Sequence, residues 1–70
     1  MITIGQIQER LSDAIKQSGL TQKAIAEKLN TSQQSISHYI KGERVPTLDT
    51  FANLCVVLDV DPSDILCVKP

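Results

Sequence analysis

The chain has 70 residues, of which 41% are hydrophobic and 21% charged, and its formal net charge is −1. Since a domain usually takes roughly 100–200 residues, we expect one small globular domain over 1–70, which excludes a doubly wound sheet, a TIM barrel and a two-domain cleft enzyme. No stretch approaches the ~20 apolar residues of a membrane span, and the N-terminus lacks a signal-peptide pattern. We therefore expect a cytoplasmic protein without a membrane partner.

The first predicted helix follows a capping signal close to the N-terminus. Thr3 and Gln6 have the spacing of a capping box, in which each side chain bonds the backbone N–H of the other residue. Gly19 ends the helix, because glycine adopts the left-handed conformation at little cost. The apolar residues of this segment follow a helical period at Ile4, Ile7, Leu11, Ala14 and Ile15.

Two further helices are predicted in the middle of the chain, over 22–29 and 33–41. Thr21 and Ser32 precede them and are residue types that accept hydrogen bonds from the first backbone N–H groups of a helix. Asn30 ends the first of these helices, because asparagine also enters the left-handed region, and a glycine closes the second. The residues expected to be buried are Ile25, Ala26, Leu29, Ile36 and Ile40, with Tyr39 in the core or at its rim.

Two more start signals complete an all-α pattern. Pro46-Thr47 opens a fourth helix, and Asp61-Pro62-Ser63-Asp64 combines an N-cap, a proline at the first helical position and an acidic third residue to begin a short fifth one. No alternating strand pattern occurs between the helices. The apolar stripe of the fourth helix consists of Phe51, Leu54, Cys55 and Leu58.

The two middle helices have the features of a helix-turn-helix, over about residues 21–41. They are joined by a short turn, and Ala26 is the small residue that allows them to cross closely. Asn30 supplies the unusual backbone angles of the turn, and Ile36 anchors the second of these helices on the first. Such a motif presents its second helix to the major groove of DNA.

A set of characteristic residues extends this motif over most of the chain: Gln22, Ala26, Asn30, Ile36, Gly42, Pro46, Phe51, Leu54, Leu58 and the ending Val60-Asp61-Pro62-Ser63-Asp64-Ile65-Leu66. In their order and spacing, from about residue 6 to 66, the chain resembles the Cro/phage-repressor (XRE-like) helix-turn-helix family. The resemblance implies a compact five-helix, lambda-repressor-like DNA-binding domain. It further implies a sequence-specific transcriptional regulator, which we expect to be a repressor with a double-stranded DNA operator as its partner.

The predicted DNA contacts divide into two sets. The solvent-facing residues of the helix over 33–41 are uncharged hydrogen-bonding groups, and in the family pattern the positions of Gln33, Gln34 and His38 face bases. The expected base contacts are Gln33, Gln34, Ser37 and His38. The expected contacts to the DNA backbone are Gln22, Lys23, Ser35, Lys41 and Arg44.

Charge is distributed unevenly along the chain. The segment 16–44 has a net charge of +3, whereas 1–15 has −1 and 45–70 has −3. Because local potential steers a polyanion, the basic middle segment favours DNA binding despite the acidic total. A second interpretation stays open, in which the same fold serves as a protein-interaction module such as an antitoxin or a coactivator-like bridge.

Other function classes find little support in the residues. The chain has one histidine, two cysteines without a CxxC motif, and no glycine-rich phosphate loop, so we expect no enzyme, cofactor, metal site or small-molecule substrate. We expect Cys55 and Cys67 to be reduced thiols. A homodimer on DNA is expected, because operators with two-fold symmetry match proteins with the same symmetry. The candidate dimer surface consists of Val56, Val57 and the tail Leu66-Cys67-Val68.

Overall fold

The computed structural model describes residues 1–69, so Pro70, the last residue of the predicted domain, lies outside the described part. Within these residues the chain is helical and contains no strand, which confirms the all-α prediction. The elements are α1 (Ile4–Gln17), α2 (Gln22–Leu29), α3 (Gln33–Lys41), α4 (Leu48–Leu58) and α5 (Pro62–Ile65). In residues 1–69 no helix combines the length and the apolar character that are needed to cross a membrane.

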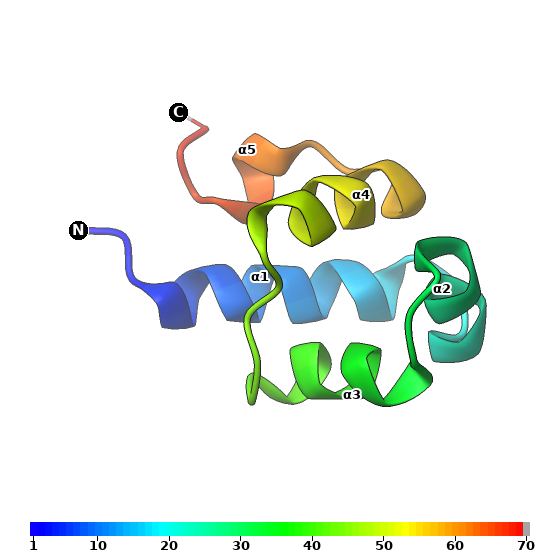
Figure 1. The fold of residues 1–70 in the computed structure, drawn as a ribbon. Coiled ribbons are helices and arrows are strands. Elements are labelled where there is room, and N and C mark those ends of the chain that lie inside the picture. The colour runs from blue at the N-terminus through cyan, green and yellow to red at the C-terminus, as the bar shows by residue number, and fades with distance from the viewer. Residues whose placement is uncertain (70) are drawn as a thin grey trace.

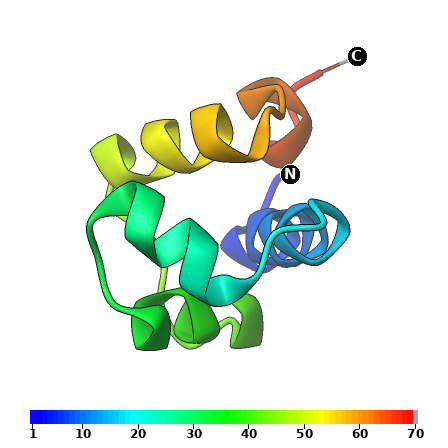
Figure 2. The same ribbon diagram turned by 90° about the vertical axis from the view of Figure 1, so that its right-hand side faces the viewer.

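The first helix lies between the other elements (Figure 1). α3 packs on one side of α1, α5 on the other, and α2 bridges α3 and α4 at the end of α1 that is far from both termini. Figure 2 shows the same arrangement along α1, with α3 and α4 on opposite sides of α2. The outer surface of α3 is therefore remote from α4 and α5.

Four helices begin at the side-chain caps that the sequence predicts. Thr3 and Gln6 form the complete capping box, and Thr21 accepts a hydrogen bond from the Ala24 N–H. Ser32 accepts one from the Ser35 N–H at the start of α3. At α5, Asp61 accepts from the Ser63 N–H, with Pro62 at the first helical position. These bonds satisfy donors that a helix start otherwise leaves unpaired.

Three helices end with the same backbone geometry. Asn30, Gly42 and Asp59 follow α2, α3 and α4 in the left-handed conformation, with φ of 55°, 73° and 55°. In each case the left-handed residue and the next one donate their N–H groups back to carbonyls of the last turn, which is the Schellman motif. The sequence predicted the first two ends, whereas Asp59 was not expected to adopt this conformation.

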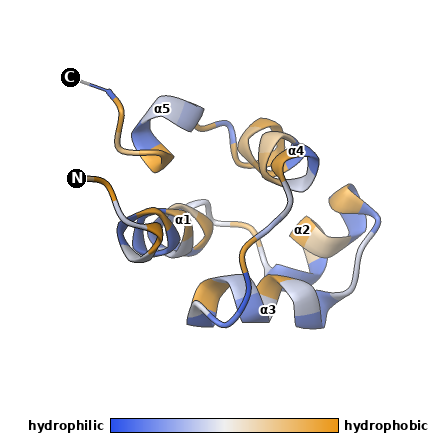
Figure 3. Cartoon of the chain, turned by 60° about the vertical axis from the view of Figure 1, so that its left-hand side comes forward, coloured by the Kyte–Doolittle hydropathy of each residue, from blue (hydrophilic) through white to orange (hydrophobic). Residues whose placement is uncertain are grey.

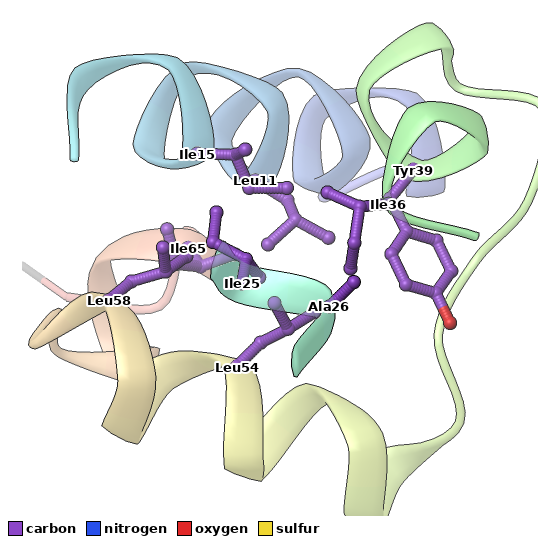
Figure 4. Packing of buried hydrophobic residues seen from close by; sticks show 9 residues of the cluster. All are labelled: Leu11, Ile15, Ile25, Ala26, Ile36, Tyr39, Leu54, Leu58 and Ile65. Atoms are coloured by element: carbon purple, nitrogen blue, oxygen red, sulfur yellow. The ribbon is translucent and has the colours of Figure 1, made fainter. Parts of the chain in front are cut away.

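The hydrophobic core joins all five helices (Figure 4). Tyr39 is only 7% exposed and belongs to this core, as expected. Ile4 was expected in the buried stripe of α1 but is 55% exposed, because it lies in the first turn at the edge of the packed region. Leu29 and Ile40 are half-buried and pack against the core. The buried cluster consists of Leu11, Ile15, Ile25, Ala26, Ile36, Tyr39, Leu54, Leu58 and Ile65.

Both cysteines are free thiols. Cys55 is buried in α4, and this burial raises the pKa of its thiol, with a smaller contribution from the negative charge of Asp61. Cys67 is half-buried behind α5.

Candidate nucleic-acid interface

The turn between α2 and α3 is built from local hydrogen bonds. The N–H of Asn30 donates to the Glu27 carbonyl at 3.2 Å, and the N–H of Thr31 donates to the Ala26 carbonyl at 2.9 Å. Ala26 is 3% exposed and Ile36 is fully buried, so the small residue and the apolar anchor occupy the places that the sequence predicted. α2 and α3 pack directly on each other as a helix-turn-helix.

The outward face of α3 carries the side chains predicted to contact bases. Gln33 and Gln34 are exposed, and their side-chain amides make no hydrogen bond within residues 1–69. Ser37 and His38 follow one turn further along and are half-buried rather than fully solvent-facing. Figure 3 shows polar residues along the side of α3 that faces away from the other helices.

The residues predicted to contact the DNA backbone lie at both ends of the motif. Gln22 is half-buried and Lys23 exposed in the first turn of α2. Ser35 is half-buried in the first turn of α3, where its hydroxyl lies 3.0 Å from the Ser32 hydroxyl. Lys41 and Arg44 are exposed at the far end of α3. Within residues 1–69, Lys23, Lys41 and Arg44 form no ion pair, so their charges are available to an anionic partner.

Two side chains of α1 fix the C-terminal end of α3. The Ser12 hydroxyl donates to the Ile40 carbonyl at 2.9 Å, and the Gln8 side-chain amide donates to the Gly42 carbonyl at 3.1 Å. Ser12 is only 8% exposed. These bonds join residues 28 and 34 positions apart, so no local sequence pattern could predict them. They hold the orientation of α3 relative to the core.

The partner of His38 was not predicted from the sequence. The Nδ1 atom of His38 lies 3.1 Å from Oε1 of Glu43, which is the second residue after α3. A signal was present, since a glycine that ends a helix in a Schellman motif brings these two positions together. One ring nitrogen of His38 is therefore occupied within the chain.

Three acidic residues of the C-terminal segment gather at the opposite part of the molecule. Asp59, Asp61 and Asp64 line a surface depression together with residues of α1. Lys69 lies 3.7 Å and 3.5 Å from the carboxylates of Asp61 and Asp64. Because α5 and α3 lie on different sides of α1 (Figure 1), the negative charge of this end is separated from the polar face of α3. The uneven charge of the sequence thus becomes a spatial separation.

Comparisons with known proteins agree with this geometry. The chain is 36% identical over 58 residues to the HTH-type transcriptional regulator ImmR of Bacillus subtilis (strain 168). The alignment covers 83% of this chain and 46% of that protein, so the chain spans about half the length of this relative. No solved structure gives a significant match. The protein family described as helix-turn-helix matches residues 11–65. With the fold and the motif described above, the chain belongs to the helix-turn-helix family.

Proposed function

We propose that this chain is a DNA-binding transcriptional regulator that contacts a double-stranded operator through the major groove with α3. The observation that carries the proposal is the pair of exposed amides of Gln33 and Gln34, which lie in the first turn of α3 and have no partner within residues 1–69. Family membership and the name of the Bacillus relative, a transcriptional regulator, support the same function.

The chemistry of these side chains suits base recognition. An α-helix fits the major groove, and the N-terminal residues of the second helix of such a motif contact base edges. A glutamine amide can bond N6 and N7 of adenine together, and one such pair contributes about 1–3 kcal/mol of discrimination. Ser37 and His38 lie one turn further along and extend the same row of hydrogen-bonding groups. We propose these four residues as the base contacts.

The backbone of the duplex would be held at both ends of the motif. Gln22 and Lys23 lie at the start of α2 and Ser35 at the start of α3, where helix N-termini favour phosphate groups. Lys41 and Arg44 supply positive charge at the other end of α3. Contacts of this kind position the protein, while the glutamines select the sequence.

Repression and dimerisation are the finer parts of the proposal. The resemblance to phage repressors favours repression, and two copies would contact half-sites roughly 34–36 Å apart. Val56 is 79% exposed and Val68 60% exposed, so both offer apolar surface to a second copy. Val57, in contrast, packs against the core and contributes less to such a contact.

Selection from a pool of random duplexes at near-physiological salt tests the function. We expect enrichment of an inverted repeat, and a pool without any enriched sequence would contradict sequence-specific binding. Gln33→Ala and Gln34→Ala should relax the selected sequence while the fold is kept. Lys23→Ala and Arg44→Ala should weaken binding to all sequences alike and reduce the log–log salt slope by about 0.9 for each lost phosphate contact.

A protein-interaction module is the second candidate, and one observation favours it. Leu48 and Val56 of α4 are 87% and 79% exposed, so this helix presents apolar side chains that take no part in the core. The affinity for a protein partner bound at this apolar surface should change little with a moderate rise in salt concentration. The affinity for DNA, bound through several phosphates, should fall steeply. A titration of affinity against salt concentration distinguishes the two functions.

A further inference from the structure

The ends of α2, α3 and α4 share one backbone geometry but differ in the side chains that it brings together. In a Schellman motif, the third residue before the last helical position and the second residue after it are linked by a backbone hydrogen bond. At the end of α4 these positions hold Cys55 and Val60, which is the usual apolar pairing. At the end of α3 they hold His38 and Glu43. A polar pair therefore replaces the usual apolar one at the helix that faces DNA.

The hydrogen bond between these two side chains determines where the imidazole holds its proton. An ionised carboxylate only accepts hydrogen bonds, so Nδ1 of His38 must be the donor across the 3.1 Å contact with Glu43. In the neutral ring, Nε2 then keeps its lone pair and accepts a hydrogen bond. Within residues 1–69, Nε2 has no partner. The half-buried ring is thus oriented, with one acceptor atom unused.

Stability alone does not account for a carboxylate at this position. Negative charge is unfavourable at the C-terminal end of a helix, because the helix dipole is negative there. Glu43 also stands between Lys41 and Arg44 and reduces the positive charge that phosphates would meet. Its side chain is 54% exposed, so its contact with His38 contributes little to folding. The contact with His38 is the one favourable interaction that the described structure gives this carboxylate.

We infer that Glu43 is a positioning residue for base recognition. Its carboxylate holds the proton of His38 on Nδ1, so that Nε2 accepts a hydrogen bond from an amino-bearing base. In the major groove these bases are adenine, through N6, and cytosine, through N4. The inference rests on the proposed function of α3 and adds a preference at one position of the half-site.

The state of the imidazole can be measured in the free protein, because His38 is the sole histidine of the chain. Long-range ¹H–¹⁵N NMR at an alkaline pH, where the ring is neutral, should show the proton on Nδ1 in the parent. In Glu43→Ala the Nε2-protonated form should become populated. Glu27→Ala removes an exposed acid of α2 that has no contact with His38, and this matched control should leave the ring unchanged.

The same variants should then be compared by selection from random duplexes. An Nε2–H donates, so Glu43→Ala should favour guanine or thymine, whose O6 and O4 atoms accept, and should select against cytosine, which presents only a donor, where the parent favours adenine or cytosine. We expect the enrichment ratio at that position to change by about fivefold, the size of one hydrogen bond. In a His38→Ala background, Glu43→Ala should leave the selected base unchanged, since the two residues act as a unit. Glu27→Ala should select the parental site.

The outcomes separate this inference from the function on which it rests. A proton on Nε2 in the parent would overturn it, and so would a ring that changes in Glu43→Ala while the selected site stays the same. If the parent enriches no sequence, the proposed function fails, and the role of Glu43 in base recognition fails with it. If the parent enriches a site that Glu43→Ala also selects unchanged, the function stands and only the role of Glu43 is lost.

Discussion

α3 and α4 are built alike but present different surfaces. Both are short helices that bury one face, with Ile36 and Leu54 fully buried, and both end in a Schellman motif. Their outer faces differ, because α3 presents amide groups whereas α4 exposes Leu48 and Val56. Figure 3 shows this contrast, with α4 largely hydrophobic and the outer side of α3 polar.

The contrast between α3 and α4 indicates that the fold depends on residues other than those on the outer faces of the helices. The buried faces and the helix ends specify the fold, and they are of the same kind in both helices. The outer residues are not needed to specify the fold. The exposed polar side chains of α3 therefore indicate a partner that forms hydrogen bonds. This division can be tested by comparing substitutions at buried and exposed positions, and at equivalent positions of different helices.

The largest effect is expected within α4 itself. Leu54→Ala removes a fully buried side chain and should lower the free energy of unfolding by about 2–5 kcal/mol. Leu48→Ala makes the same substitution at a residue that is 87% exposed, and should change the free energy of unfolding by no more than about 0.5 kcal/mol. Urea denaturation of both variants measures the difference. Equal losses would show that the division into buried and outer faces is wrong.

A smaller effect is expected at the helix starts. Ser32→Ala removes the hydroxyl that accepts the Ser35 N–H and should cost about 0.5–2 kcal/mol of unfolding free energy. Thr47 stands at the same place before α4 but caps no backbone N–H, since its hydroxyl donates to Asp49 Oδ1 at 2.6 Å. Thr47→Ala should therefore cost less. The reverse order in urea denaturation would contradict the assigned caps.

The smallest expected effect is a loss of stability at acidic pH. The two carboxyl groups that cause it, Asp49 and Asp61, lie in α4 and before α5. The Ser63 N–H that Asp61 accepts lowers the pKa of that carboxyl, and the Thr47 hydroxyl lowers the pKa of Asp49. A lowered folded-state pKa gives stability that is complete above the unfolded value, roughly pH 4, and is lost as pH falls through the folded value. Both groups should therefore stabilise the fold at neutral pH.

Asp61→Asn keeps a capping side chain but cannot ionise. Its unfolding free energy should fall less between neutral pH and acid than that of the parent. Ser32→Ala, which removes an uncharged cap, should keep the parental pH dependence. An unchanged acid dependence in Asp61→Asn would show that Asp61 does not carry the effect. Urea denaturation at several pH values measures both variants.

Local signals account for what the sequence predicted. Hydroxyl caps, Asn30 and Gly42 act on neighbouring backbone groups, so their pattern is visible in a few residues. The left-handed Asp59 was missed because aspartate adopts this conformation less often than glycine or asparagine. The exposure of Ile4 was missed because a periodic stripe does not tell where the packed region ends.

The candidate site was predictable only in part. The exposure of Gln33 and Gln34 could be predicted, because the apolar period of α3 identifies its buried face and these residues lie on the other face. The bonds from Gln8 and Ser12 to the end of α3 depend on how α1 packs, which no local pattern encodes. The predicted end of α3 at Gly42 brings His38 and Glu43 together, but their hydrogen bond also depends on the orientation of both side chains, which no sequence pattern specifies.

The measurement that tests the central proposal most directly is an NMR titration of the chain with a selected duplex. The side-chain amides of Gln33 and Gln34 give their own ¹H–¹⁵N signals, and Gln17 of α1, exposed beside the acidic depression, serves as the internal reference. We expect the two α3 signals to move and saturate with added duplex while that of Gln17 stays in place. Static α3 amides, with the largest changes elsewhere on the protein, would contradict it.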